Sequence, residues 1–110
     1  IETRQPGGDM NPYLCIAACL LSGLHGIENG LKPPSYATGN AGNDTRFRRL
    51  PTTLREATKL FKESEKVNEL FGSDFVGQFA LTRDNECDLF EQWCTENVTE
   101  WEVRRYFDTI

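Results

Sequence analysis

The feature that most constrains the fold is the stretch 10–27, which contains no Asp, Glu, Lys or Arg. Asn11 at its start is a typical helix N-cap, Pro12 suits the first helical position, and Gly30 suits the end. The apolar core of the run is shorter than the roughly 18 residues that a membrane span needs. Because apolar residues occupy nearly every side of it, the sequence predicts a helix over 11–29 that is buried on most sides.

The rest of the chain divides into a loop and a helical region. Residues 35–50 are rich in Gly, Asn and Arg and show no apolar period, which predicts one long loop. From 53 to 110 apolar residues recur at helical spacing, which predicts a helical subdomain. The capping boxes that indicate helix starts in it pair Thr53 with Glu56 and Thr99 with Glu102.

The net charge of the chain argues against one class of function. Seventeen acidic against twelve basic residues give a net charge of −5, which argues against a nucleic-acid binder, because such a protein needs a basic face. The excess acid lies in 52–110, where it fits the solvated faces of amphipathic helices, with an acidic docking surface as the alternative. A length of 110 residues is that of one domain.

The cysteines and the chain start indicate the compartment. The four cysteines form no C-x-x-C pair and the chain has a single histidine, so a zinc set of two cysteines and two histidines is excluded. No secretion signal precedes them, and we expect reduced cysteines in a cytoplasmic protein that binds no membrane. The chain begins at Ile1 without an initiator Met, as though cut from a longer protein.

Glu2 and Arg4 are the candidate chemical groups. Residues 1–4 are predicted to be extended, and on a strand alternate side chains point to the same face. A carboxylate and a guanidinium that project together can hold a cation and an anionic substrate. Taken alone, the pair would more simply be a surface ion pair.

The order of several motifs along the chain supports the chemical interpretation. E-x-R-x-P occupies 2–6, N-P-Y-L occupies 11–14, and a helix that contains G-I at 26–27 follows. L-P-T-T-L-R-E-A occupies 50–57, and the chain closes on V-T-E-W-E at 98–102 with R-Y-F at 105–107. With this order and spacing, nearly the whole chain resembles the C-terminal part of the catalytic domain of glutamine synthetases.

This resemblance implies a fold, an activity and two site residues. The parent would have an α+β catalytic domain, of which this chain is a mainly α-helical segment with a short N-terminal strand. It would be an ATP-dependent ligase that joins glutamate to ammonia or an amine through a γ-glutamyl phosphate, and it would assemble as a ring-shaped homo-oligomer. Glu2 would be a ligand of Mg²⁺ or Mn²⁺. Arg4 would be catalytic and substrate-binding, in contact with glutamate or its phosphoryl group.

Departures from the family pattern leave alternatives open. No Tyr lies between Asn40 and Pro51, which argues against regulation by adenylylation. The stretch 39–41 looks more like the branch that joins glutamate to polyamines or other amines. Relatives that serve as non-catalytic lens proteins, or a helical oligomerisation segment, are the competing class. A cation site needs several ligands, and Glu2 is the only one that the resemblance places in this chain. We therefore expect the chain to be inactive by itself.

Other conspicuous residues have simpler interpretations. His25, late in the first helix, suits packing or a helix C-terminal contact better than catalysis. Arg46, Arg48 and Arg49 would steer an anionic nucleotide, make a subunit contact, or lie on a solvated loop. Aromatic residues at helical spacing are core or interface; they are Trp93, Trp101, Tyr106 and Phe107.

Overall fold

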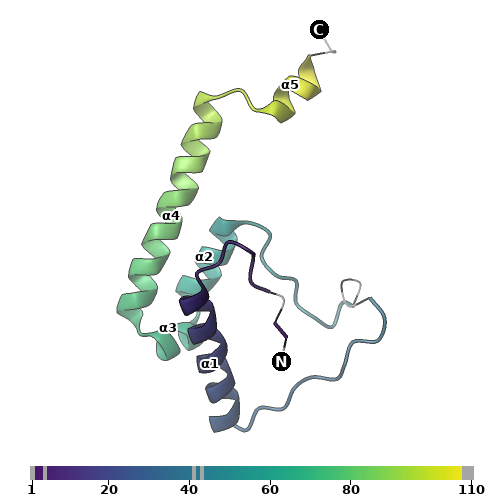
Figure 1. Cartoon of the computed structure of the whole chain (residues 1–110), viewed down its shortest axis with the longest axis vertical. Coiled ribbons are helices and arrows are strands. Elements are labelled where there is room, and N and C mark those ends of the chain that lie inside the picture. The colour runs from purple at the N-terminus through teal and green to yellow at the C-terminus, as the bar shows by residue number, and fades with distance from the viewer. Residues whose placement is uncertain (1, 4, 41, 43, 108–110) are drawn as a thin grey trace. The chain divides into compact units, whose positions relative to one another are not determined.

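The computed structural model describes residues 2–3, 5–40, 42 and 44–107 of the chain (Figure 1). It divides into two units, Ile1–Arg48 and Arg49–Ile110, each of which has its own internal contacts. Within the described residues, no helix has the length and apolarity needed to cross a membrane.

Helix α1 (Pro12–Glu28) is the regular element of the first unit. The Asn11 side chain accepts hydrogen bonds from the backbone N–H groups of Tyr13 and Leu14, at 3.0 and 3.3 Å, so the predicted N-cap is confirmed. At the other end Gly30 adopts φ +57, a conformation that favours glycine and ends the helix. Apart from 3₁₀ backbone at 42 and a turn at 45–46, the described residues from 31 to 53 have irregular backbone.

The predicted N-terminal strand is not seen. Residues 2 and 3 are irregular, while 1 and 4 lie outside the described residues, and none of the described residues forms a strand anywhere. A strand needs a neighbouring strand to accept its backbone hydrogen bonds, and the described part of this chain provides none. The E-x-R-x-P motif at 2–6 therefore does not form a strand in the absence of a neighbouring strand.

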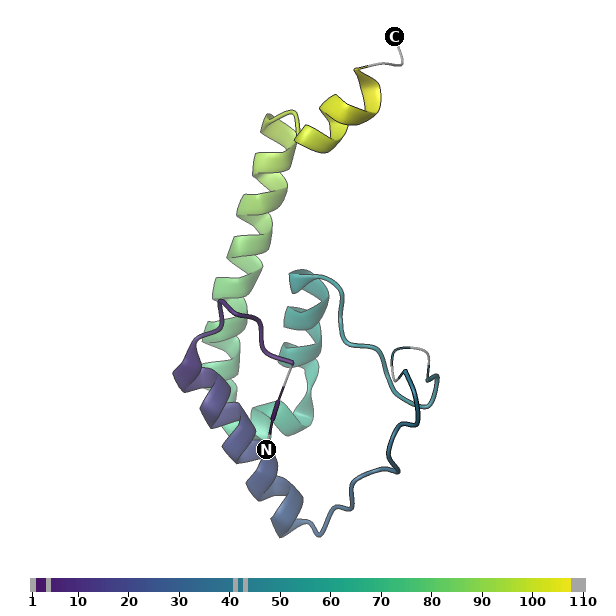
Figure 2. The same cartoon turned by 45° about the vertical axis from the view of Figure 1, so that its right-hand side comes forward.

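The second unit is helical, as predicted for 53–110 in general terms. Its elements are α2 (Leu54–Glu63), α3 (Glu65–Phe71), α4 (Ser73–Glu96) and α5 (Glu100–Tyr106). Both views show α2 and α3 beside α4 (Figures 1 and 2). The Thr53 hydroxyl accepts from the Glu56 N–H at 3.1 Å, but the Glu56 carboxylate accepts from Thr52, so the predicted capping box at this end is only half formed.

The core of this unit lies between α2 and α4. Val76, Ala80 and Cys87, which share one face of α4, are buried. Thr58 of α2 is buried as well. Thr58 satisfies its hydroxyl by donating to the Leu54 carbonyl at 2.8 Å, which avoids an unpaired polar group in the core.

Four phenylalanines extend this core across α2, α3 and α4. Phe61 packs edge-on to Phe79 with ring centroids 5.5 Å apart, and lies 6.3 Å from Phe71. Phe75 stacks between Phe71 and Phe79 at 5.9 and 5.7 Å. Aromatic pairs at such spacing stabilise beyond their buried area, so this cluster joins three helices.

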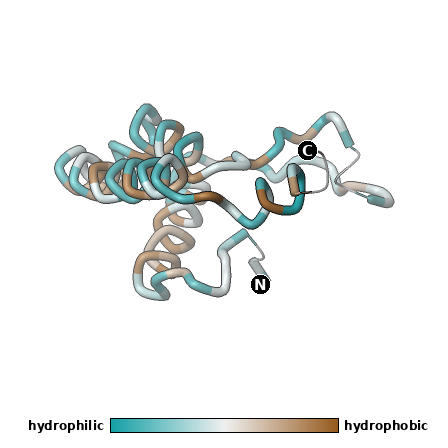
Figure 3. The backbone as a smooth tube through the Cα atoms, turned by 90° about the horizontal axis from the view of Figure 1, so that it is seen from above, coloured by the Kyte–Doolittle hydropathy of each residue, from teal (hydrophilic) through white to brown (hydrophobic). Residues whose placement is uncertain are grey.

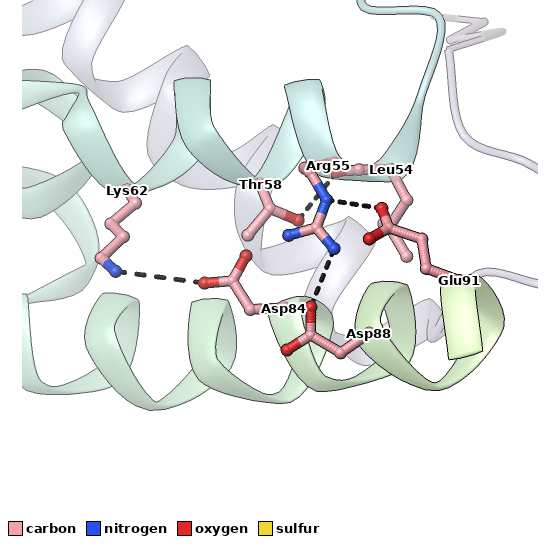
Figure 4. A network of polar contacts seen from close by, with 7 residues as sticks. All are labelled: Leu54, Arg55, Thr58, Lys62, Asp84, Asp88 and Glu91. Carbon is pink, nitrogen blue, oxygen red and sulfur yellow. Dashed lines mark hydrogen bonds and ion pairs between the residues drawn. The ribbon is translucent and has the colours of Figure 1, made fainter. Parts of the chain in front are cut away.

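Ion pairs across α2 and α4 flank the core (Figure 4). Arg55 donates to Asp88 at 2.8 Å and to Glu91 at 2.9 Å, and these carboxylates raise its pKa. Lys62 lies 4.0 Å from Asp84. As residue numbers rise along α2, their partners on α4 fall, so the two helices run antiparallel. Asp88 and Glu91 are thus paired across helices while their side chains stay exposed, in keeping with the solvated faces that the sequence suggested.

Helix α5 begins with a complete capping box, as predicted. The Thr99 N–H and hydroxyl both donate to the Glu102 carboxylate at 2.8 Å, and the Glu102 N–H donates back to Thr99 at 3.3 Å. The backbone bond from Thr99, followed by its hydroxyl bond, lowers the pKa of Glu102 below its ordinary value of 4.5. The ionised carboxylate is therefore the form that stabilises this helix start.

We expect α5 to lose stability in acid through this carboxylate. Its folded pKa is the lower one, so its contribution is complete above the unfolded value of 4.5 and is lost as the pH falls through the folded value. Emission of Trp101, in a Trp93→Phe background, is to be followed from about pH 6 to about pH 3. The Glu102→Gln variant does not titrate at this position, and an identical acid transition in both proteins would contradict the prediction.

Candidate functional site

Of the two predicted site residues, the structure describes one. Glu2 is described and exposed. Arg4 lies outside the described residues, so its position relative to Glu2 stays a prediction. Between and after them, Thr3, Gln5 and Pro6 are described and lie alongside α1.

An apolar cleft of about 1010 Å³ runs between this N-terminal segment and α1. Its wall on the segment consists of Thr3, Gln5 and Pro6. Its wall on the helix combines small residues with larger apolar ones, and these are Cys15, Ala18, Cys19, Leu20, Ser22, Gly23, Leu24 and Ile27. Sequence reasoning did not single out this cleft, although the recurrence of small residues on one side of the helix was a signal for it.

One thiol beside the cleft, that of Cys15, has little reactive character. All four cysteines of the chain are free thiols in the structure. Burial, and then the neighbouring Cys19 one turn along α1, raise the pKa of Cys15. Because the thiolate is the nucleophilic form, a raised pKa argues against Cys15 as a nucleophile.

The described residues do not make a cation site by themselves. Mg²⁺ takes six ligands in near-octahedral geometry, which one or two carboxylates share with waters and substrate phosphates. Glu2 is of the right chemical type, but among the described residues no group of three or more His, Cys, Asp or Glu side chains converges. Glu2 is therefore not part of such a group within the described residues, and its metal role stays a prediction.

Two other residues singled out in the sequence have local structural partners. The Asn29 side-chain amide lies 2.9 Å from Nδ1 of His25, at the C-terminal end of α1, as the sequence suggested for His25. In the loop, Arg46 forms a two-pronged ion pair with Asp44, with its shortest distance at 2.6 Å, and lowers the pKa of that carboxyl. The guanidinium of Arg46 also lies over the Phe47 ring, so it serves this loop rather than a free anion.

Comparison with known proteins identifies the family. The model of the glutamine synthetase catalytic domain matches residues 1–106. The chain is 42% identical over 109 residues to a gamma-glutamylethanolamide synthetase of Streptomyces coelicolor, covering 99% of this chain and 22% of that protein. It is 43% identical over 112 residues to a glutamate–isopropylamine ligase of a Pseudomonas species, covering 100% of this chain and 24% of that protein.

A less similar relative is named for a different activity. A glutamine synthetase of Staphylococcus aureus is 34% identical over 113 residues, covering 96% of this chain and 24% of that protein. No solved structure matches the chain. The chain thus spans less than a quarter of the length of these relatives, and over that span it belongs to the glutamine synthetase family, within the catalytic domain.

Proposed function

We propose that this chain is the C-terminal part of the catalytic domain of an ATP-dependent ligase that joins glutamate to an amine. The observation that carries the proposal is the match to two ligases of this kind at 42% and 43% identity along essentially the whole chain. The family match over residues 1–106 supports the same assignment.

The proposed reaction has two steps. The γ-carboxylate of glutamate attacks the γ-phosphoryl group of ATP, which gives γ-glutamyl phosphate and ADP. The amine then attacks the activated carbonyl, phosphate leaves, and the amine loses a proton to give the amide. A divalent cation, Mg²⁺ or Mn²⁺, would supply charge neutralisation for the nucleotide phosphates.

Glu2 and Arg4 have separate proposed roles in this reaction. Glu2 would be one oxygen ligand of the cation, in keeping with the preference of Mg²⁺ for carboxylates. Arg4 would bind the carboxylate of glutamate or the phosphoryl group transferred to it. A planar guanidinium matches either anion through two hydrogen bonds and stabilises the charge that spreads over the phosphoryl oxygens.

An organic amine is a better candidate than ammonia for the acceptor. The two relatives named for ethanolamide and isopropylamine products are 42% and 43% identical, against 34% for the glutamine synthetase of Staphylococcus aureus. Ammonia is the second candidate, because that relative covers 96% of the chain as well. A non-catalytic, lens-type or oligomerisation role is the remaining alternative, and a ring-shaped homo-oligomer is proposed for the parent.

A coupled assay of ADP release tests the proposal. The full-length protein, with glutamate and ATP, is expected to turn over faster with ethanolamine or isopropylamine than with ammonia. Faster turnover with ammonia would assign glutamine synthesis, and no turnover with any of them would favour the non-catalytic alternative. The 110-residue chain by itself is expected to be inactive, since it offers one described cation ligand, and turnover by it would refute that expectation.

A further inference from the structure

We infer that Asn29 is a site of spontaneous deamidation, at which the next backbone nitrogen converts the asparagine into aspartate or isoaspartate. Asn29–Gly30 is the only Asn–Gly pair in the sequence. Helix α1, which is mostly brown or pale in Figure 3, ends at this pair, with Asn29 as its C-cap. Both residues are exposed. The inference concerns this chain's own backbone and does not depend on ligase activity.

The reaction needs only these two neighbouring residues and water. The Gly30 backbone nitrogen attacks Cγ of Asn29, the bond from Cγ to Nδ2 breaks, and the proton of the Gly30 N–H leaves with Nδ2 as ammonia. The product is a succinimide, in which the Gly30 nitrogen is bonded to both carbonyl carbons of residue 29. Addition of water at Cγ breaks the new bond and gives aspartate. Addition at the main-chain carbonyl breaks the original peptide bond and gives isoaspartate.

Gly30 makes this helix end reactive. Because glycine has no Cβ atom, its backbone nitrogen can approach the preceding side chain with little steric hindrance. Gly30 adopts φ +57, a conformation that L side chains rarely adopt, so any other residue would be strained there. The end of α1 therefore favours the same residue type that most favours closure of the succinimide ring.

Three contacts engage the reacting groups while the helix end is closed. The Gly30 N–H donates to the Ile27 carbonyl at 3.1 Å. The Asn29 amide nitrogen donates to the His25 carbonyl at 2.9 Å and lies 2.9 Å from Nδ1 of the same histidine. The last turn of α1 must therefore open before the Gly30 nitrogen can attack. Helix ends open at little cost in free energy, so we expect this opening to control the rate.

Deamidation weakens the helix end that it modifies. The new carboxylate lies at the C-terminal end of α1, where the helix dipole disfavours negative charge. An ionised carboxylate has no proton to donate, so the hydrogen bond from residue 29 to the His25 carbonyl is lost. The Asn29→Asp variant reproduces this charge, and we expect it to lower the melting temperature relative to the unmodified protein.

Asn97 is a matched control within the same chain. It is the exposed C-cap of α4, and its side-chain amide donates to the Trp93 carbonyl at 2.9 Å, as that of Asn29 does to the carbonyl four residues before it. The residue that follows is Val98, whose branched Cβ hinders attack by its nitrogen. The two asparagines thus differ chiefly in the residue that follows them.

The test follows both asparagines in the full-length protein. The protein is incubated in neutral buffer at physiological temperature, and mass spectrometry of its peptides measures conversion over time. Most of Asn29 should be converted, with release of an equal amount of ammonia, while Asn97 keeps its amide. The Val98→Gly variant should extend the reaction to Asn97, and Asn29→Ser should abolish the early release of ammonia.

Isoaspartate distinguishes ring closure from direct hydrolysis of the side chain. Labelling by an isoaspartyl methyltransferase should appear at residue 29, because only the succinimide route moves the main chain onto Cγ. Aspartate without isoaspartate would overturn the mechanism, and conversion of Asn29 no faster than that of Asn97 would overturn the site. A protein without ligase turnover that still forms isoaspartate at residue 29 would uphold this inference while the proposed function failed.

Discussion

Replacement of Glu2 by alanine in the full-length protein is expected to lower kcat/KM for the glutamate–amine ligation by at least about 100-fold. The estimate follows from the loss of one charged group that acts on a phosphoryl-transfer site, where single such groups contribute on the order of 10²–10³ in rate. Affinity for Mn²⁺ should fall in parallel, because one anionic oxygen ligand is removed. The two measurements are the steady-state rate and a Mn²⁺ titration.

A nearby carboxylate provides the control for this variant. Asp9 is exposed and lies in the same unit, so Asp9→Ala removes the same charge without touching a proposed ligand. It should leave both the rate and the affinity for Mn²⁺ near those of the parent. Normal Mn²⁺ affinity in the Glu2→Ala protein would contradict the metal role, whatever the effect on turnover.

Replacement of Phe79 by alanine is expected to destabilise the helical unit by about 3 kcal/mol. The typical cost of truncating a core phenylalanine is about 3–5 kcal/mol, and the lower end applies because the Phe79 ring is only half-buried. This side chain contacts both Phe61 of α2 and Phe75 one turn before it on α4. Its removal therefore loosens the contact between these helices. Urea unfolding, followed by circular dichroism, gives the free energy.

Phe90→Ala is the matched control. Phe90 is also a phenylalanine of α4 in a ring pair, with Trp93, but it is 65% exposed. Its truncation should cost less than about 1 kcal/mol. Equal losses from the two variants would show that the cluster around Phe79 does not form the core of the unit.

The sequence predicted helix ends, which depend on neighbouring residues, but predicted little of the tertiary structure. Asn11, Gly30 and the capping box at Thr99 depend only on residues within one turn, so each could be recognised from its neighbours. The strand over 1–4 depends on a partner strand, which no local pattern supplies. That is why the prediction failed for the described residues 2 and 3.

The same local patterns could not predict which helices contact each other. Arg55 and Glu91 are 36 residues apart, and periodicity places each on a helix face without stating which faces meet. The site presents the same difficulty in stronger form. Motif order pointed to Glu2 and Arg4, but the described residues bring no three His, Cys, Asp or Glu side chains together, and the roles of the pair stay predictions.

The antiparallel pairing of α2 with α4 has a consequence for folding kinetics. Only α3 separates the two helices in the chain, so even the contact of Arg55 with Glu91, 36 residues apart, stays within this helical unit. Chains with such local contacts fold in about microseconds to milliseconds, because little loop entropy is lost before contacts form. We therefore expect this unit to fold quickly.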